Sequence, residues 1–165
     1  MADKTLAERL QPSLLDRLTD DEPGKEVESR DRKVIDLSRL REILQRDLSA
    51  LLNTNSFETL LDLDAMPHVA RSVLNYGVRE VSGEYSTSER AEMIRKSIAS
   101  AIDIFEPRII PGSVDVELRE EEAPGEMLVA FDIRADMWAQ PMPIELYLRS
   151  KVDLTSGQVA LERSG

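Results

Sequence analysis

The last third of the chain alternates apolar and polar residues with a period of two. Four runs carry this alternation, at residues 114–118, 129–137, 144–148 and 159–161, and it is typical of β-strands with one buried face. Turn-forming sequences separate the runs: Ala123-Pro124-Gly125, Gln140-Pro141-Met142-Pro143 and Thr155-Ser156-Gly157. Because the connections are short, the pattern predicts a four-stranded antiparallel meander with one face packed on helices.

Two earlier segments, about 38–52 and 88–105, show the three- and four-residue spacing of amphipathic helices. Their predicted inward residues are Leu37, Leu40, Ile43, Leu44, Leu48, Leu51 and Leu52, then Ala91, Ile94, Ile98, Ala101, Ile102 and Phe105. We expect Asp36 or Ser38 to cap the first helix and Ser88 to cap the second. Asn53-Thr54-Asn55-Ser56 should end the first helix and Pro107 the second. Helices followed by strands predict an α+β fold.

Residues 53–87 between the two helices form a long connection with little periodicity. Pro67 can begin a short helix, and Asn75-Tyr76-Gly77 can end it, with Gly77 as a left-handed cap. A connection of this length is uncommon unless it has a function, so we expect an ordered excursion.

The first 35 residues differ in character from the rest. A leucine stripe with helical spacing is followed by a polar stretch at 19–26 that contains a Pro-Gly turn. We therefore predict a docking helix and flexible linker on residues 1–35 and the α+β domain on residues 36–165. The predicted partner-binding residues of the helix are Leu14, Leu15, Arg17 and Leu18. The same pattern suits a helix that folds back onto its own domain.

Composition narrows the classes of function. The chain has 21 basic and 32 acidic side chains, a net charge of −11, which disfavours nucleic acid as a partner. It has no cysteine and one histidine, His68, and it carries no phosphate-binding glycine loop or hydrolase signature. We therefore expect no catalytic residue, cofactor or metal. No signal peptide or membrane-spanning run is present, so we expect a cytoplasmic protein without direct membrane insertion.

Glu106-Pro107-Arg108 is the most distinctive short motif, at the junction between the second long helix and the first strand. A rigid proline sets the direction of a carboxylate and of a planar guanidinium fork. Such a pair can bind a partner, or Glu106 and Arg108 can pair with each other. A local basic stretch at 30–46, with six basic and three acidic residues, is likewise either a contact surface or a solvated helix face.

Four motifs in order resemble one known family. They are Leu14-Leu15-Asp16-Arg17-Leu18, Arg46-Asp47-Leu48-Ser49-Ala50-Leu51-Leu52-Asn53-Thr54, Ser72-Val73-Leu74-Asn75-Tyr76-Gly77 and Phe105-Glu106-Pro107-Arg108. Together, over about residues 10–162, they resemble TssE, the baseplate wedge component of the type VI secretion system. TssE is itself similar to a wedge protein of contractile phage tails that has been labelled lysozyme-like.

The resemblance implies a structural, non-enzymatic subunit at the cytoplasmic face of the inner membrane. Its implied partners are the wedge subunits TssF, TssG and TssK and the contractile sheath subunits. Glu106, Pro107 and Arg108 are implied to grip the helical bundle at the wedge core, and the C-terminal strands to pair with the first sheath ring. Many relatives carry arginine where this chain has Asn55. A peptidoglycan hydrolase and a regulatory adaptor on the same fold are the alternatives.

Overall fold

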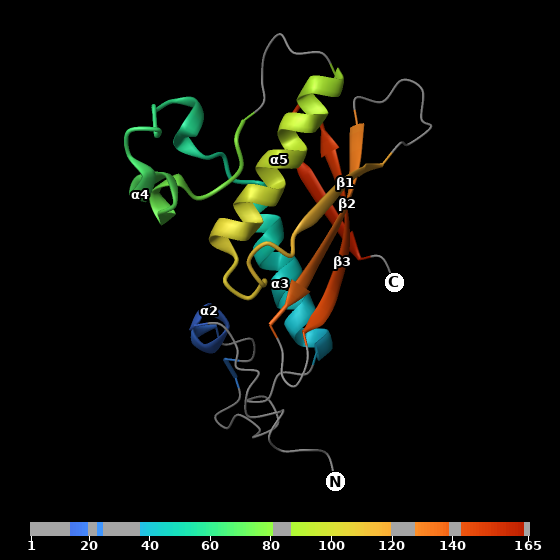
Figure 1. Cartoon of the computed structure of the whole chain (residues 1–165). Coiled ribbons are helices and arrows are strands. Elements are labelled where there is room, and N and C mark those ends of the chain that lie inside the picture. Colours follow the sequence, from blue (N-terminus) through green and yellow to red (C-terminus); the bar gives the residue numbers. More distant parts are fainter. Residues whose placement is uncertain are drawn as a thin grey trace.

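The computed structural model describes residues 14–19, 23–24, 37–80, 87–119, 128–138 and 143–163. Within them the helices precede the strands, which confirms the predicted α+β class (Figure 1). The α-helices are α2 (Leu14–Leu18), α3 (Leu37–Leu52), α4 (Pro67–Ala70) and α5 (Thr87–Phe105), and two 3₁₀ helices are η2 (Phe57–Thr59) and η3 (Val73–Asn75). The strands are β1 (Asp115–Arg119), β2 (Leu128–Met137), β3 (Ile144–Asp153) and β4 (Val159–Arg163).

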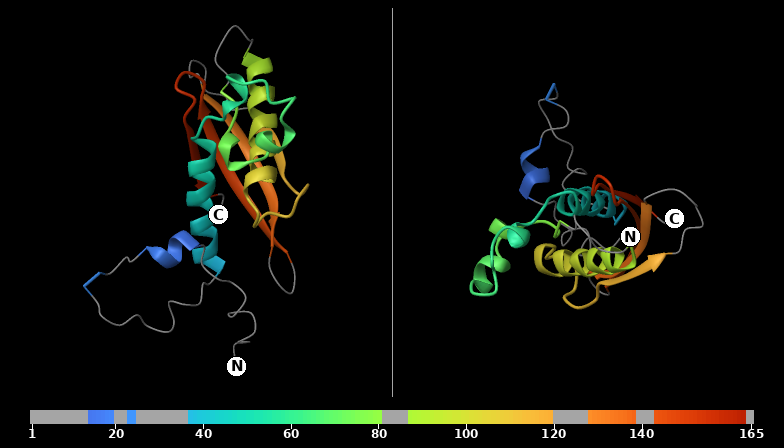
Figure 2. Two further views of the ribbon diagram at one scale, coloured as in Figure 1. Left: turned by 90° about the vertical axis from the view of Figure 1, so that its left-hand side faces the viewer. Right: turned by 90° about the horizontal axis from the view of Figure 1, so that it is seen from above.

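The four strands form an antiparallel meander in the order β1-β2-β3-β4, as the alternation predicts. The register pairs Ile133 of β2 with Val116 of β1 and with Leu148 of β3. Because side chains alternate between the two faces of a sheet, these three residues share one face. All three are buried, and α3 and α5 lie against this face (Figures 1 and 2).

The opposite face of the sheet is charged and open to solvent. Arg149 lies 3.6 Å from Asp132 on the neighbouring strand, and the Arg134 guanidinium lies 5.6 Å from the centre of the Tyr147 ring. Apolar residues thus face the helices and charged residues face water, which fixes the register against a one-residue slip.

The C-terminal end of α3 is joined to the edge strand β4. The Asn53 carboxamide accepts a hydrogen bond from the Val159 N–H at 3.0 Å and donates one to the Val159 carbonyl at 2.9 Å. Two helical turns earlier, Gln45 Nε2 donates to the Leu161 carbonyl at 3.0 Å. Asn53, which follows the end of the helix, and Gln45 within it therefore hold the last strand against α3.

Residues 54–78 leave the body and return to it through a closed neck. Ser56 N–H donates to the Val78 carbonyl, and Val78 N–H donates to the Thr54 carbonyl, both at 2.8 Å. Gly77 has a φ of 128°, and a Cβ there would lie 2.3 Å from the Thr54 carbonyl oxygen. Two backbone segments meet here too closely for any side chain. The prediction of Gly77 as a helix cap is therefore wrong: glycine is needed for the close approach.

The excursion is ordered, as predicted, but its helices differ from the prediction. α4 begins at Pro67 and ends at Ala70, while Val73–Asn75 form the separate helix η3. Asn75 is buried and joins the parts, since its carboxamide accepts from Phe57 N–H at 2.9 Å and donates to the Ala70 carbonyl at 3.0 Å. The two bonds satisfy this buried carboxamide and tie η2 and α4 to η3.

Other local predictions have mixed outcomes. Ser88 is not an N-cap, because α5 begins one residue earlier, at Thr87. The turn after β3 is confirmed: the Asp153 carboxylate accepts from Thr155 N–H at 2.7 Å, and Gly157 has a φ of 73°. The predicted turn at 123–125, the turn at 140–143 apart from Pro143, and the linker apart from Thr19, Pro23 and Gly24 lie outside the described residues. Within the described ranges, no helix combines the length and apolarity that crossing a bilayer requires.

Candidate functional site

The Glu106-Pro107-Arg108 motif forms the tight junction between α5 and the sheet. Glu106 N–H still bonds the Ile102 carbonyl at 3.0 Å, and Pro107 then ends the helical pattern because it has no N–H to donate. The Arg108 carbonyl accepts from Trp138 N–H at 2.8 Å, and the buried Ile109 bridges Met137. Bonds to both sides of the junction thus fix the position of the Arg108 backbone.

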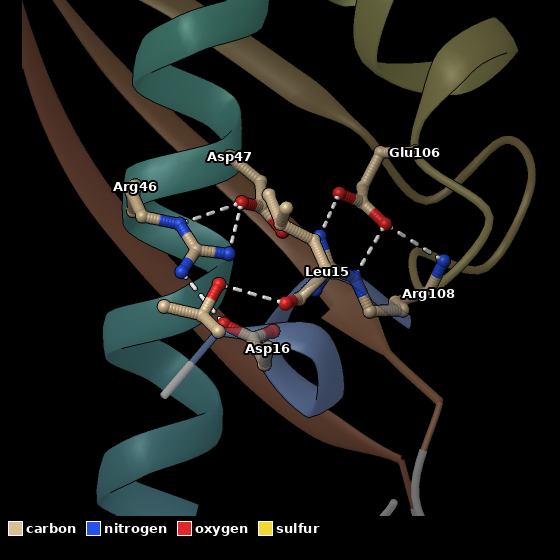
Figure 3. Close-up of polar contacts among 7 residues, drawn as sticks. Leu15, Asp16, Arg46, Asp47, Glu106 and Arg108 are labelled. Carbon is tan, nitrogen blue, oxygen red and sulfur yellow. Dashed lines mark hydrogen bonds and ion pairs between the residues drawn. The ribbon is translucent and has the colours of Figure 1, made fainter. Parts of the chain in front are cut away.

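The Glu106 carboxylate is 6% exposed and turns back onto Arg108 (Figure 3). It accepts hydrogen bonds from Arg108 N–H at 3.0 Å, from Nε at 2.7 Å and from Nη2 at 2.5 Å. Two parallel bonds from a guanidinium to a carboxylate are the strongest form of this pair. Of the two readings of the motif, the internal Glu106–Arg108 pair is therefore present in the structure.

The pair belongs to a longer charge network. Arg108 Nη2 also donates to Asp47 Oδ2 at 2.7 Å, and Asp47 Oδ1 accepts from Arg46 at 2.9 and 2.7 Å. Arg46 in turn reaches Asp16 of α2 at 2.6 Å (Figure 3). Three carboxylates and two guanidiniums thus alternate in sign from the junction, across α3, to the N-terminal helix. We call these five residues, Asp16, Arg46, Asp47, Glu106 and Arg108, the charge network.

The contacts within the charge network favour the charged forms of both arginines. Burial by itself lowers the pKa of Arg108, but the hydrogen bonds and charges of Glu106 and Asp47 outweigh it, so the pKa is raised well above its usual value. Bonds to Asp16 and Asp47 raise the pKa of Arg46. Tyr76 lies beside the network with its ring edge-on to Phe105, the centroids 5.5 Å apart. Burial raises the pKa of its phenol, the charges of Asp47 and Glu106 raise it further, and Arg108 opposes them.

Part of the network remains open to a partner. The Glu106 side chain is almost fully enclosed, whereas the side chains of Arg108 and Asp47 are about a quarter exposed, at 26% and 27%. No hydrogen bond among the described residues uses Arg108 Nη1. The chemistry available at the surface is thus one guanidinium edge that can donate to a carbonyl or carboxylate, beside one partly exposed carboxylate.

The predicted N-terminal helix exists as α2, and its leucines are uncovered. Leu14, Leu15 and Leu18 are 71%, 62% and 75% exposed, while the Asp16 side chain is only 11% exposed. The side chain of Arg17 lies outside the described part of the structure. The helix therefore meets the body through its polar side, and the apolar side of the same helix faces outward.

Sequence reasoning found Glu106 and Arg108 but missed Asp16, Arg46 and Asp47 as their neighbours. These contacts join positions 30 and 61 residues apart, and no spacing rule marks them. His68 is exposed, and the described ranges contain no cluster of three histidine or acidic side chains able to hold a metal ion.

The fold and the charge network together define a small α+β protein with an ordered, partly exposed charged site on its surface. Comparison with protein families then identifies its class: the model described as "Baseplate wedge protein gp25" matches residues 38–142, more than half of the chain. The chain therefore belongs to the baseplate wedge protein gp25 family, and the predicted membership of a baseplate wedge family is confirmed.

A solved structure is also similar to the chain. It is described as "The baseplate complex from the type VI secretion system", and the match has 16% sequence identity and a TM-score of 0.43. The match covers 70% of this chain and 95% of the other. None of the curated proteins compared with the chain matches it.

Proposed function

We propose that the chain is a structural, non-enzymatic subunit of the baseplate wedge of a type VI, contractile secretion system. In this role it joins wedge assembly to the initiation of sheath polymerisation on the cytoplasmic side of the inner membrane. Family membership over residues 38–142 is the observation that carries the baseplate role. The four ordered motifs that resemble TssE support the type VI assignment.

The charge network is the proposed contact with the other wedge subunits TssF, TssG and TssK. Glu106 and Asp47 hold Arg108 from two sides, so the guanidinium is oriented before any partner arrives. A donor that is already fixed loses less conformational entropy on binding. In this proposal Glu106 positions Arg108, Pro107 sets the chain direction, and Arg108 makes the contact.

The N-terminal segment 1–35 is the proposed docking arm, beside the domain on residues 36–165. Its support is the exposure of Leu14, Leu15 and Leu18, which nothing in the described structure covers. A short helix with one apolar side is a common ligand for a groove on another protein. Replacing Leu14 and Leu18 with serine should leave the domain folded and weaken capture by the wedge subunits, measured by co-purification.

The sheath contact is proposed for the edge of the sheet. β4 pairs with β3 on one side and ends the strand order. Because Asn53 and Gln45 already bond the Val159 N–H and the Val159 and Leu161 carbonyls, a strand added at the other edge of β4 has to displace these bonds. Backbone groups at such an edge can accept a strand from a neighbouring subunit. The resemblance of the C-terminal strands to the strand-exchange part of sheath subunits supports this role.

The test is a charge-neutral double variant, Glu106→Ala with Arg108→Ala, so that neither charge is left alone. The variant should fold, shown by circular dichroism, but fail to co-purify with TssF, TssG and TssK and fail to support sheath assembly. The matched control, Glu117→Ala with Arg134→Ala, removes an exposed pair from the outer face of the sheet and should assemble normally. Normal assembly of the Glu106/Arg108 variant would refute the role of the motif.

A further inference from the structure

The excursion at residues 54–78 exposes more apolar surface than the fold requires. Six large apolar side chains on it are 42–81% exposed: Phe57, Leu60, Leu61, Met66, Val73 and Leu74. In Figures 1 and 2 the excursion stands out from the body beside α5. Single exposed apolar residues are ordinary, but a group of them on one segment marks an interaction surface.

Hydrogen bonds at its base and in its interior fix the conformation of the excursion. Its neck is closed by the two bonds between 54–56 and 78, and its interior is organised around Asn75. Compact loops with closed ends are frequently functional. Ordering a segment costs conformational entropy, and these exposed leucines return little of it through burial in their own chain.

A groove of about 430 Å³ lies between this excursion and α5. Its apolar wall includes Leu61, Leu63, Ile104 and Phe105. Ser56, which is 5% exposed, also lines it, and its buried hydroxyl makes no hydrogen bond within the described part of the chain. Leu60 and Leu74 are the chain neighbours of two lining residues, Leu61 and Asn75. The exposed leucines are therefore next to groove-lining residues in the sequence.

The charge of the groove indicates what it binds. Its lining includes Glu58, Asp62 and Asp64 against Arg71 and Arg79. Glu58 and Arg79 lie 3.9 Å apart as an ion pair, whereas Asp62, Asp64 and Arg71 have no ion-pair partner among the described residues. With three carboxylates against two guanidiniums the lining is net acidic, and the carboxylates of Asp62 and Asp64 beside apolar walls complement cations next to apolar side chains.

We propose that the excursion and its groove bind an amphipathic helix of another protein, whose apolar side is flanked by lysine or arginine. The apolar side covers Leu60, Leu74 and the wall of the groove, and the flanking cations pair with Asp62 and Asp64. This surface lies outside the charge network, and the proposal does not depend on the proposed function.

The test uses the full chain and a fluorescent leucine/lysine helical peptide of about 18 residues, long enough for helix formation on its own. Two comparison peptides replace every lysine with glutamate, or every leucine with serine. Anisotropy titrations should show binding of the leucine/lysine peptide alone. Equal binding of all three peptides, or no binding of the first, would overturn the proposal.

Two variants with matched controls locate the binding. Leu60→Ser with Leu74→Ser should weaken it about tenfold or more, because the bound helix no longer buries these two leucine side chains. Asp62→Asn with Asp64→Asn should weaken it severalfold at low salt and reduce its salt dependence, while the new carboxamide at position 62 keeps an acceptor for the backbone N–H of residue 64. The controls are Leu118→Ser with Leu128→Ser, and Glu117→Gln with Glu162→Gln, all at exposed sites of the sheet.

The controls should bind like the unaltered chain. An equal loss in the controls would mean non-specific attraction to an acidic protein, and the proposal would fail. Light scattering on the unaltered chain adds a further arm. If the chain self-associates and Leu60→Ser with Leu74→Ser makes it monomeric, the surface joins copies of this chain, and the heterologous partner is wrong.

Discussion

Replacing Arg108 with alanine should reveal how strongly the charge network stabilises the fold. The substitution removes both guanidinium bonds to Glu106 and the bond to Asp47. The Glu106 carboxylate, 6% exposed, then keeps only the bond from the backbone N–H of residue 108. A carboxylate that is buried without its partner is more costly than the pair was favourable.

The magnitude follows from the burial of the two partners. Removing one member of a fully buried pair costs about 3–5 kcal/mol. Because the Arg108 side chain is 26% exposed, water reaches part of the site, and we expect a loss of about 2–4 kcal/mol in the free energy of unfolding. A domain of ordinary stability remains folded after such a loss.

The assay is urea denaturation followed by circular dichroism, with a double-mutant cycle over Glu106→Ala and Arg108→Ala. The double variant should lose less than the sum of the single variants, with a coupling of about 1–3 kcal/mol. Arg134→Ala is the control, since Arg134 forms an exposed pair at 3.7 Å and its loss should cost at most about 1 kcal/mol.

Equal losses for Arg108→Ala and Arg134→Ala, together with additive single variants, would refute this reasoning. The network would then behave as ordinary surface charge. A loss well above about 5 kcal/mol would also contradict it, because the exposure of Arg108 would then be irrelevant.

Three further predictions concern the neck, the phenol beside the network and the N-terminal helix. Gly77→Ala should cost about 2–4 kcal/mol or open the neck, because its Cβ meets the Thr54 carbonyl; urea denaturation and faster hydrogen exchange at residue 78 measure this. Tyr76 has a raised phenol pKa in the folded state, so its contribution to stability is complete below about pH 10 and is lost as pH rises through the folded pKa; ultraviolet titration should show a late transition that Tyr76→Phe removes. Asp16→Asn breaks the pair with Arg46 and should cost at most about 1 kcal/mol while increasing proteolysis at α2; unchanged cleavage there would show that the pair does not hold α2.

The long elements could be predicted from the sequence because their signals are local. The inward stripe of α5 and the alternation along β2 each repeat over many residues, and burial follows the predicted positions. One end was misplaced: α5 begins at Thr87, before the expected cap Ser88. Helix ends depend on a few weak local bonds, so they are less well determined than the stripe.

The excursion and the charge network could not be derived in the same way. Gly77 is required by the approach of Thr54, which is 23 positions earlier in the chain. Arg108 meets Asp47 because of how α3 packs beside α5. The chain has 32 acidic residues, so the sequence alone does not indicate which of them pairs with Arg108. Only the packed structure shows which carboxylate each guanidinium meets.

The bonds from Asn53 and Gln45 to β4 have a mechanical consequence. A strand at the edge of a sheet is held by its ladder on one side only, so it can peel away one residue at a time when its free end is pulled. Here the fraying end meets the Gln45 bond to Leu161 first and then both Asn53 bonds to Val159. A force on the C-terminal end of β4 is therefore borne by these side-chain bonds to α3 as well as by the ladder to β3. We expect β4 to resist peeling more than an edge strand held by its ladder alone.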